Sequence, residues 1–177
     1  WFENWAELQT VLAELVLAVP EWRRVLDFGC GPGIMIDLMN EHGLDYTGFD
    51  PSLEARALYS KHYGKYPNKY LNVIHDKKFD AVLSFDVLEH MSDEEIVDLN
   101  ALFSDVRDLF VNISRAPGIP GHINLKSDEE WIAFFAENGR SFDKVKTALL
   151  REKYVTLRPT CCDAWNENMF VFTREGL

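Results

Sequence analysis

The stretch VLDFGCGPG, residues Val25–Gly33, places three glycines at every second position directly after a short apolar run. A glycine-rich loop between a buried strand and a helix lets the backbone approach a ligand, because glycine has no Cβ to collide with it. The dinucleotide pattern G-x-G-x-x-G would need a further glycine where the chain has Ile34, and Asp27 before the loop would disfavour a pyrophosphate. The stretch therefore indicates a nucleotide-binding loop and argues against NAD.

Strand and helix patterns alternate on both sides of this loop, which is typical of a parallel sheet with helices on both faces. The strands that we expect are residues 23–28, 45–50, 69–75, 78–86, 109–114, 141–149 and 168–175. No helix is evident between the last two, so we expect them to pair as antiparallel neighbours at the sheet edge. The predicted fold class is α/β, with a Rossmann-like, seven-stranded, mostly parallel sheet and an antiparallel edge strand.

The chain has 177 residues, the size of one domain, and contains no linker, repeat or low-complexity segment. We expect residues 1–22 to form an N-terminal helix that could cover the site as a lid, and residues 23–177 to form the core. Capping boxes at Ser92–Glu95 and Ser127–Glu130 predict the starts of two helices. Most of the later aromatic residues, a group that includes Trp165, are expected in the core.

The composition limits the partners and the compartment. Lys and Arg total 18 against 29 Asp and Glu, for a net charge of −11, which disfavours binding to duplex nucleic acid. No apolar run approaches the ~20 residues that span a membrane. The three cysteines have no framework spacing, which favours a reducing compartment and predicts a cytoplasmic location.

Three segments in register resemble the class I S-adenosylmethionine-dependent methyltransferases, in their ubiquinone-biosynthesis-like small-molecule branch. VLDFGCGPG matches the first motif of that family, YTGFDPS (residues 46–52) matches the end of its second strand, and KFDAVLSFDVLEHM (residues 78–91) matches its fourth strand and the following turn. The order of strands and helices also matches, so the resemblance spans nearly the whole chain. It implies a methyltransferase with S-adenosyl-L-methionine as cofactor.

The resemblance assigns cofactor-binding roles to residues around the glycine loop. Gly29, Cys30 and Gly31 would line the methionine part of the cofactor through their backbone. Asp27 would meet its amino group through water. Asp50 would hold both ribose hydroxyls, since one carboxylate can accept two hydrogen bonds.

The same resemblance extends to the adenine and to the transferable methyl group. The residues that it places beside adenine are Pro51, Ser52 and Leu53. An acid after the third strand often faces the adenine amine in this family, and Asp76 is the best match. Phe85 and Asp86, at the end of the fourth strand, would face the methionine end and the methyl group.

The methyl group is already activated on a sulfonium, so the protein mainly has to align a nucleophile with it. A base helps when the acceptor must lose a proton, and the candidates are His90 in the LEHM turn and His122 after the fifth strand. Two structural alternatives stay open, since His90 could anchor its turn and His122 could cap the following helix.

The leading hypothesis is methyl transfer to a small-molecule acceptor, with O-methylation slightly favoured. A second hypothesis is a metal-dependent O-methyltransferase acting on a quinol or an RNA 3′ end. Some members of the family that act on such acceptors bind Mg²⁺ through a turn with acidic residues and a histidine, together with a later histidine. The matching residues in this chain are Asp86, Glu89, His90 and His122. A third is a non-catalytic cofactor-binding domain of a larger assembly. An open site could be completed by the N-terminal helix or by a second copy in a homodimer.

Overall fold

The computed structural model describes residues 2–74, 78–157 and 163–177, with side chains for all of these except residues 2–7 and 163–164. The described chain forms one seven-stranded sheet in the order β3-β2-β1-β4-β5-β7-β6. The strands are β1 Arg24–Phe28, β2 Asp45–Phe49, β3 Tyr70–Leu71, β4 Ala81–Phe85, β5 Asp108–Asn112, β6 Ser141–Phe142 and β7 Met169–Thr173.

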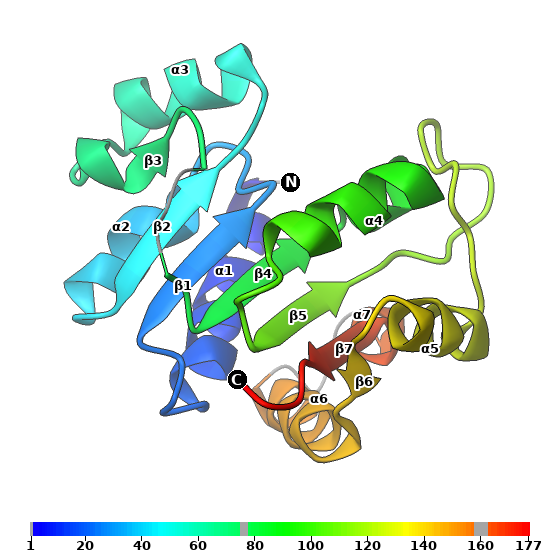
Figure 1. The fold of residues 1–177 in the computed structure, drawn as a ribbon. Helices are drawn as coiled ribbons and strands as arrows, with labels where there is room; N and C mark the ends of the chain where they lie inside the picture. Colours follow the sequence, from blue (N-terminus) through cyan, green and yellow to red (C-terminus); the bar gives the residue numbers. More distant parts are fainter. Residues whose placement is uncertain (1, 75–77, 158–162) are drawn as a thin grey trace.

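Helices follow most of these strands and lie on both sides of the sheet (Figure 1). They are α1 Phe2–Leu17, α2 Ile34–Glu41, α3 Leu53–His62, α4 Asp93–Leu102, α5 Asp128–Glu137, α6 Lys144–Leu157 and α7 Asp163–Glu167. Two short 3₁₀ turns, Pro67–Lys69 and Leu88–His90, precede β3 and α4. In the described part of the chain, no helix has the length and apolar character needed to cross a membrane.

The predicted α/β fold is confirmed. β1 to β5 are parallel, while β7 runs antiparallel between β5 and β6 and pairs with both. The order of the strands reverses between β1 and β4, because the chain builds outward from β1 to β3 and then crosses back to start β4 and β5.

The prediction of a strand over residues 141–149 is wrong for most of its length, since β6 covers only Ser141–Phe142 and α6 follows. The expectation that no helix separates the last two strands is therefore wrong as well. The buried side chains of α6 are Thr147, Leu150 and Tyr154, spaced by three and four residues as on one face of a helix. The third strand is also shorter than expected and covers Tyr70–Leu71.

Alternate residues of each strand feed two separate cores, because successive side chains point to opposite faces of a sheet. In β1, Val25 joins a cluster with buried residues of α1, α2 and α6, whereas Leu26 joins one with residues of α4 and α5. In β4, Leu83 and Val82 divide in the same way. In Figure 1, accordingly, α4 lies in front of the sheet and α1 behind it.

Both predicted capping boxes are confirmed. The Ser92 hydroxyl accepts from the Glu95 backbone N–H while the Glu95 carboxylate accepts from the Ser92 N–H, and Ser127 and Glu130 do the same at α5. Each helix start thereby satisfies two donors that would otherwise lack partners. Because Ser127 caps α5, the alternative that His122 caps this helix is wrong.

A buried carboxylate at the start of β5 joins four parts of the chain. Asp108 is fully buried, and its Oδ2 accepts from Trp22 Nε1 at 2.7 Å and from Lys146 Nζ at 2.9 Å. Its Oδ1 accepts from the Thr173 hydroxyl at 3.0 Å. Burial acts to raise the pKa of Asp108, but these donors hold it below its ordinary value.

We predict that Trp22→Phe lowers the free energy of unfolding at pH 7 by about 1.5–3 kcal/mol more than its loss of ring area requires, because it removes a donor to this buried charge. Urea denaturation at equilibrium measures the change. Trp131→Phe is the matched control, since Trp131 is also fully buried but its Nε1 has no partner among the described residues. Equal losses in the two variants would contradict the assigned role of the Trp22 hydrogen bond.

Candidate functional site

The glycine loop lies where the strand order reverses, at the carboxyl ends of β1 and β4. In open α/β sheets, ligands bind in the crevice at this position, because the loops of the two diverging halves separate there. The end of β4 brings Phe85 and Asp86 to the same edge of the sheet.

The three glycines of the loop all have positive φ, of 82°, 51° and 69°. A Cβ on Gly29 would lie 2.4 Å from Val87 Cγ2, and one on Gly33 would lie 2.8 Å from the Tyr59 ring. A Cβ on Gly31 would meet no described atom within 4 Å. Gly29 and Gly33 therefore allow close packing of the loop, while Gly31 leaves space in front of the backbone.

Asp50 holds the loop in this shape. Its Oδ2 accepts from the Gly31 N–H at 2.9 Å, and its Oδ1 accepts from the Ser52 N–H at 2.8 Å. Each carboxylate oxygen has a further lone pair, so these bonds leave room for two hydroxyl donors. The Ser52 hydroxyl is engaged locally, since it accepts from the Ala55 N–H as the N-cap of α3.

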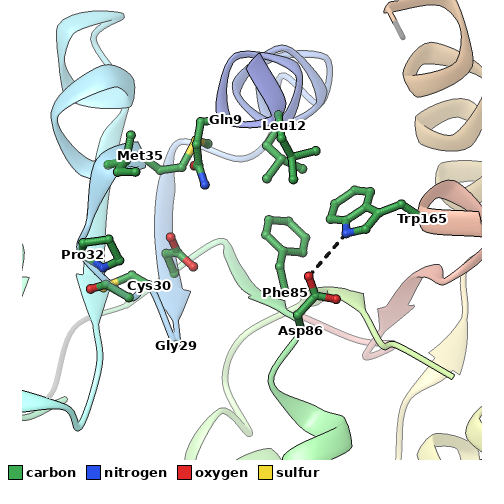
Figure 2. A pocket seen from close by; sticks show the side chains of 13 residues that line it. Gln9, Leu12, Gly29, Cys30, Pro32, Met35, Phe85, Asp86 and Trp165 are labelled. Carbon is green, nitrogen blue, oxygen red and sulfur yellow. Dashed lines mark hydrogen bonds between the residues drawn. The ribbon is translucent and has the colours of Figure 1, made fainter. Parts of the chain in front are cut away.

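A cavity of about 470 Å³ opens beside the loop, between α1, β1, β4 and α7. It gathers six of the residues expected to bind cofactor: Asp27, Gly29, Cys30, Gly31, Phe85 and Asp86. In Figure 2, α1 lies above the cavity and the end of β1 lies below it. The loop and the end of β4 thus meet around one space, as expected.

Seven lining residues were not assigned to the site from the sequence: Leu8, Gln9 and Leu12 on α1, Pro32 in the glycine loop, Ile34 and Met35 on α2, and Trp165 on α7. Figure 2 shows Gln9 and Leu12 reaching from α1 toward the cavity. The helical pattern of residues 4–22 was recognisable, but it does not say which face of the helix covers the end of the sheet. The expectation that α1 covers the site is consistent with these contacts, which come from its second and third turns.

Trp165 forms a wall of the cavity as well as packing against the core. Its Nε1 donates to Asp86 Oδ2 at 3.4 Å, drawn as the dashed line in Figure 2. Its ring lies 5.9 Å from that of Phe85 and stacks on Tyr154 at 5.3 Å. The indole therefore connects the end of β4 with the helix that precedes β7.

Asp27 is buried beneath the cavity, and this burial raises its pKa to about 7. The Tyr46 side chain opposes the rise, while the charge of Asp50 adds to it. A cationic group placed in the cavity would be stabilised by the ionised form of Asp27, because an opposite charge nearby favours ionisation.

Cys30 is not arranged as a nucleophile. Burial, followed by the charges of Asp27 and Asp50, raises the pKa of the thiol far above its ordinary value. A thiol that stays protonated is a poor nucleophile. Its role in the loop is packing, and a Cβ on Gly48 would lie 2.7 Å from its Sγ.

Asp86 has φ 54°, a left-handed conformation that aspartate tolerates better than most residues. Its backbone N–H donates to the Asn112 carbonyl at the end of β5, at 2.9 Å. Asp86 is an exposed residue, but desolvation of its carboxylate by the surrounding protein raises its pKa. The Trp165 indole and the charges of His122 and His90 oppose this rise. Such a local conformation at the edge of a cavity is typical of functional positions.

Glu89, His90 and His122 come together beyond the end of β4. One potential ligand atom from each lies within 4.8 Å of the other two, and the two imidazole rings are 4.8 Å apart at 85°. Glu89 is fully buried; its Oε1 accepts from the Ser114 N–H, whereas its Oε2 has no partner among the described residues. His122 Nδ1 is likewise buried without a described partner.

Some predicted site residues lie apart from the cavity or from the metal-ligand cluster. Asp86 lines the cavity, where its carboxylate accepts from Trp165 Nε1, and it is not part of the Glu89–His90–His122 cluster, so only three of the four predicted metal ligands come together. The lining of the cavity does not include Asp50, Pro51, Ser52, His90 or His122. Asp76 lies outside the described residues.

Known proteins share sequence and fold with this chain. A family model described as a methyltransferase domain matches residues 4–110. The ubiquinone biosynthesis O-methyltransferase of Psychrobacter arcticus (strain DSM 17307 / VKM B-2377 / 273-4) is 34% identical over 82 residues, which cover 40% of this chain and 32% of that protein. The match thus spans about a third of the length of this curated relative.

Two solved structures show the same fold. The magnesium protoporphyrin IX methyltransferase from Synechocystis PCC 6803 with bound SAM has a TM-score of 0.63 at 18% identity, covering 96% of this chain and 80% of that chain. The sugar N-methyltransferase from Streptoalloteichus sp ATCC 53650 has a TM-score of 0.63 at 15% identity, covering 96% and 87%.

We predict that Asp27→Asn removes a pH-dependent loss of stability. The pKa of Asp27 rises from 3.8 to about 7 on folding, so between these values the folded protein binds more protons and its stability falls as the pH rises. Asparagine carries no such charge. Between pH 4 and pH 8, the free energy of unfolding of the variant should therefore rise relative to that of the wild type by about 4 kcal/mol.

Urea denaturation across this pH range tests the prediction. Asp98→Asn is the control, because Asp98 is exposed on α4. A difference between Asp27→Asn and wild type that stays constant with pH would contradict the shifted pKa of Asp27.

Proposed function

Because the chain belongs to the class I S-adenosylmethionine-dependent methyltransferases, we propose that it transfers a methyl group from S-adenosylmethionine to a small-molecule acceptor, with an oxygen atom as the favoured site. The observation that best supports this is the cavity at the switch point, where the glycine loop, Asp27, Phe85 and Asp86 converge. Its volume of about 470 Å³ suits a small ligand.

The methionine end of the cofactor would occupy this cavity. Its α-ammonium group would interact with the Asp27 carboxylate, directly or through water. Gln9 Oε1, which has no partner among the described residues, could accept from the same group. Gly31, with open space in front of its backbone, allows the chain of the cofactor to pass.

The ribose would lie at Asp50, just outside the cavity. Both carboxylate oxygens of Asp50 already accept hydrogen bonds from backbone N–H groups, which holds the carboxylate in one orientation before any ligand binds. This pre-organisation would reduce the entropy lost when two ribose hydroxyls bind.

When bound, S-adenosylmethionine would supply an activated methyl group, which bonds to the nucleophile in one step as the bond to sulfur breaks and S-adenosylhomocysteine leaves. The protein would contribute alignment and exclusion of water, for which the cavity offers the apolar side chains of Leu8, Leu12, Phe85 and Trp165. A hydroxyl acceptor would lose its proton to a base, and we propose His90 or His122 for this role.

A divalent ion at Glu89, His90 and His122 is the second candidate, and it would make the reaction a metal-dependent O-methylation of a quinol or an RNA 3′ end. The residues fit an ion, because Glu89 Oε2 and His122 Nδ1 are buried atoms without described partners. An ion there would lower the pKa of a coordinated hydroxyl and reduce the need for a base.

We also propose a single-domain chain in the cytoplasm, supported by the continuous sheet and by the cysteine spacing. The chain could act as a homodimer, in which a second copy completes the site. A non-catalytic role in a larger assembly is the alternative to methyl transfer. Binding of S-adenosylmethionine without methyl transfer to any acceptor would favour the non-catalytic role.

We predict that S-adenosylmethionine raises the melting temperature of the wild type and not that of Asp50→Ala. Saturation at a hundred times Kd stabilises a protein by about 2.7 kcal/mol, and each kcal/mol shifts Tm by roughly 2–4 °C at this size. Asp50→Ala also loses two hydrogen bonds, so each protein is compared with its own ligand-free melting curve.

Asp98→Ala, on the exposed face of α4, should keep the full shift. Isothermal titration with S-adenosylhomocysteine provides an independent measure of affinity. If S-adenosylmethionine does not raise the melting temperature of the wild type and S-adenosylhomocysteine shows no binding in the titration, cofactor binding is refuted.

If the reaction depends on a metal ion, as in the second candidate, we predict that EDTA treatment abolishes methyl transfer and that a divalent cation restores it. Glu89→Gln should lower the affinity for that cation, since the amide retains the size of the side chain but has no charge. Activity that withstands both EDTA and Glu89→Gln would exclude the metal and leave the histidine base.

A further inference from the structure

The loop that carries His122 is clamped onto the turn that carries His90. The Glu89 carbonyl accepts from the Ile123 N–H at 2.9 Å and from the Asn124 N–H at 3.0 Å. The buried Asn124 side chain donates in turn to the Met91 carbonyl at 3.1 Å. The backbone around His90 is therefore fixed relative to the loop.

Within this clamp, the His90 ring makes one backbone contact that determines its protonation pattern. His90 Nδ1 lies 2.9 Å from the Gly121 carbonyl oxygen. A carbonyl oxygen only accepts, so Nδ1 must carry the hydrogen. In the neutral ring, the lone pair is then on Nε2.

Gly121 permits this contact because it has no side chain. Its φ is +90°, and a Cβ there would lie 3.0 Å from His90 Nδ1 and 3.5 Å from Cε1. The distance to Nδ1 is shorter than an ordinary van der Waals contact, so a methyl group there would require the ring to shift by a few tenths of an ångström, which would disturb its hydrogen bond with the carbonyl. Gly118, in the same loop, has φ +77°, but a Cβ there would meet nothing within 4 Å among the described residues.

We propose that Gly121 is a positioning residue that holds His90 in the Nδ1–H tautomer and thereby makes Nε2 the atom that reacts. His90 is an exposed residue, and Nε2 is the ring nitrogen that the Gly121 carbonyl does not engage. This rests on the proposed function in one respect: Nε2 takes the proton of a hydroxyl acceptor only if the chain transfers methyl groups.

The tautomer can be measured without an acceptor. In ¹⁵N-labelled protein, long-range ¹H–¹⁵N correlation spectra distinguish a protonated from an unprotonated imidazole nitrogen. His90→Gln assigns the signals of His90, and spectra are recorded about two units above the reference imidazole pKa of 6.5, because only a neutral imidazole has a tautomer. We expect Nδ1 of the wild type to be protonated and Nε2 to be unprotonated.

Gly121→Ala and Gly118→Ala form a matched pair, since each places alanine at a positive φ but only the first meets His90. We expect Gly121→Ala to shift His90 toward the Nε2–H tautomer and Gly118→Ala to leave it unchanged. A wild-type His90 protonated at Nε2 would overturn the proposal, and it does so even if Gly121→Ala does not fold. So would equal responses of the two variants.

Once an acceptor is known, Gly121→Ala should lower kcat at least tenfold relative to Gly118→Ala, with the affinity for S-adenosylhomocysteine unchanged. Equal kcat values in the two variants would overturn the assigned role of Nε2. Failure of the wild type to transfer methyl to any acceptor, with His90 still protonated at Nδ1, would refute the proposed function and not the positioning by Gly121.

Discussion

The Phe49 carbonyl accepts hydrogen bonds from both the Gly29 and the Cys30 N–H groups, at 2.8 and 3.1 Å, and so holds the glycine loop against the end of β2. The site depends on this contact. It brings Asp50, the residue after Phe49, to the Gly31 N–H, and it leaves the cavity open on the other side of the loop. A loop of larger residues could not follow this path, since a Cβ on Gly29 would overlap Val87.

Two buried carboxylates show how the same sheet serves stability and ligand binding. Asp108 is surrounded by donors, so its charge is stabilised and it joins α6 and β7 to the start of β5. Asp27 is also buried but has few donors, and its pKa of about 7 reflects a charge that the folded protein does not stabilise by itself. A buried acid left in this state beside a cavity is typical of a binding site, because a ligand can supply the missing counter-charge.

Much of the fold could be predicted because its signals are local. The glycine spacing, the short apolar runs and the two Ser-x-x-Glu boxes each act within a few residues of chain. The strand predicted at 141–149 failed because Val145 and Leu149 are exposed and the buried side chains follow helical spacing through Thr147 and Leu150. A short segment with only a few apolar residues does not by itself distinguish a strand from one face of a helix.

The sequence by itself determined the fold class, the loop with its acidic partner at Asp50, and the family, because these depend on residue types at fixed short spacings. The tertiary structure alone decided which side chains enclose the cavity. Gln9 and Trp165 are 156 positions apart, and they meet only because α1 and α7 both reach the end of the sheet where β1 and β4 diverge. It also decided the pairing of His90 with Gly121, since a hydrogen bond between distant loops depends on how the chain crosses the sheet and not on any local pattern.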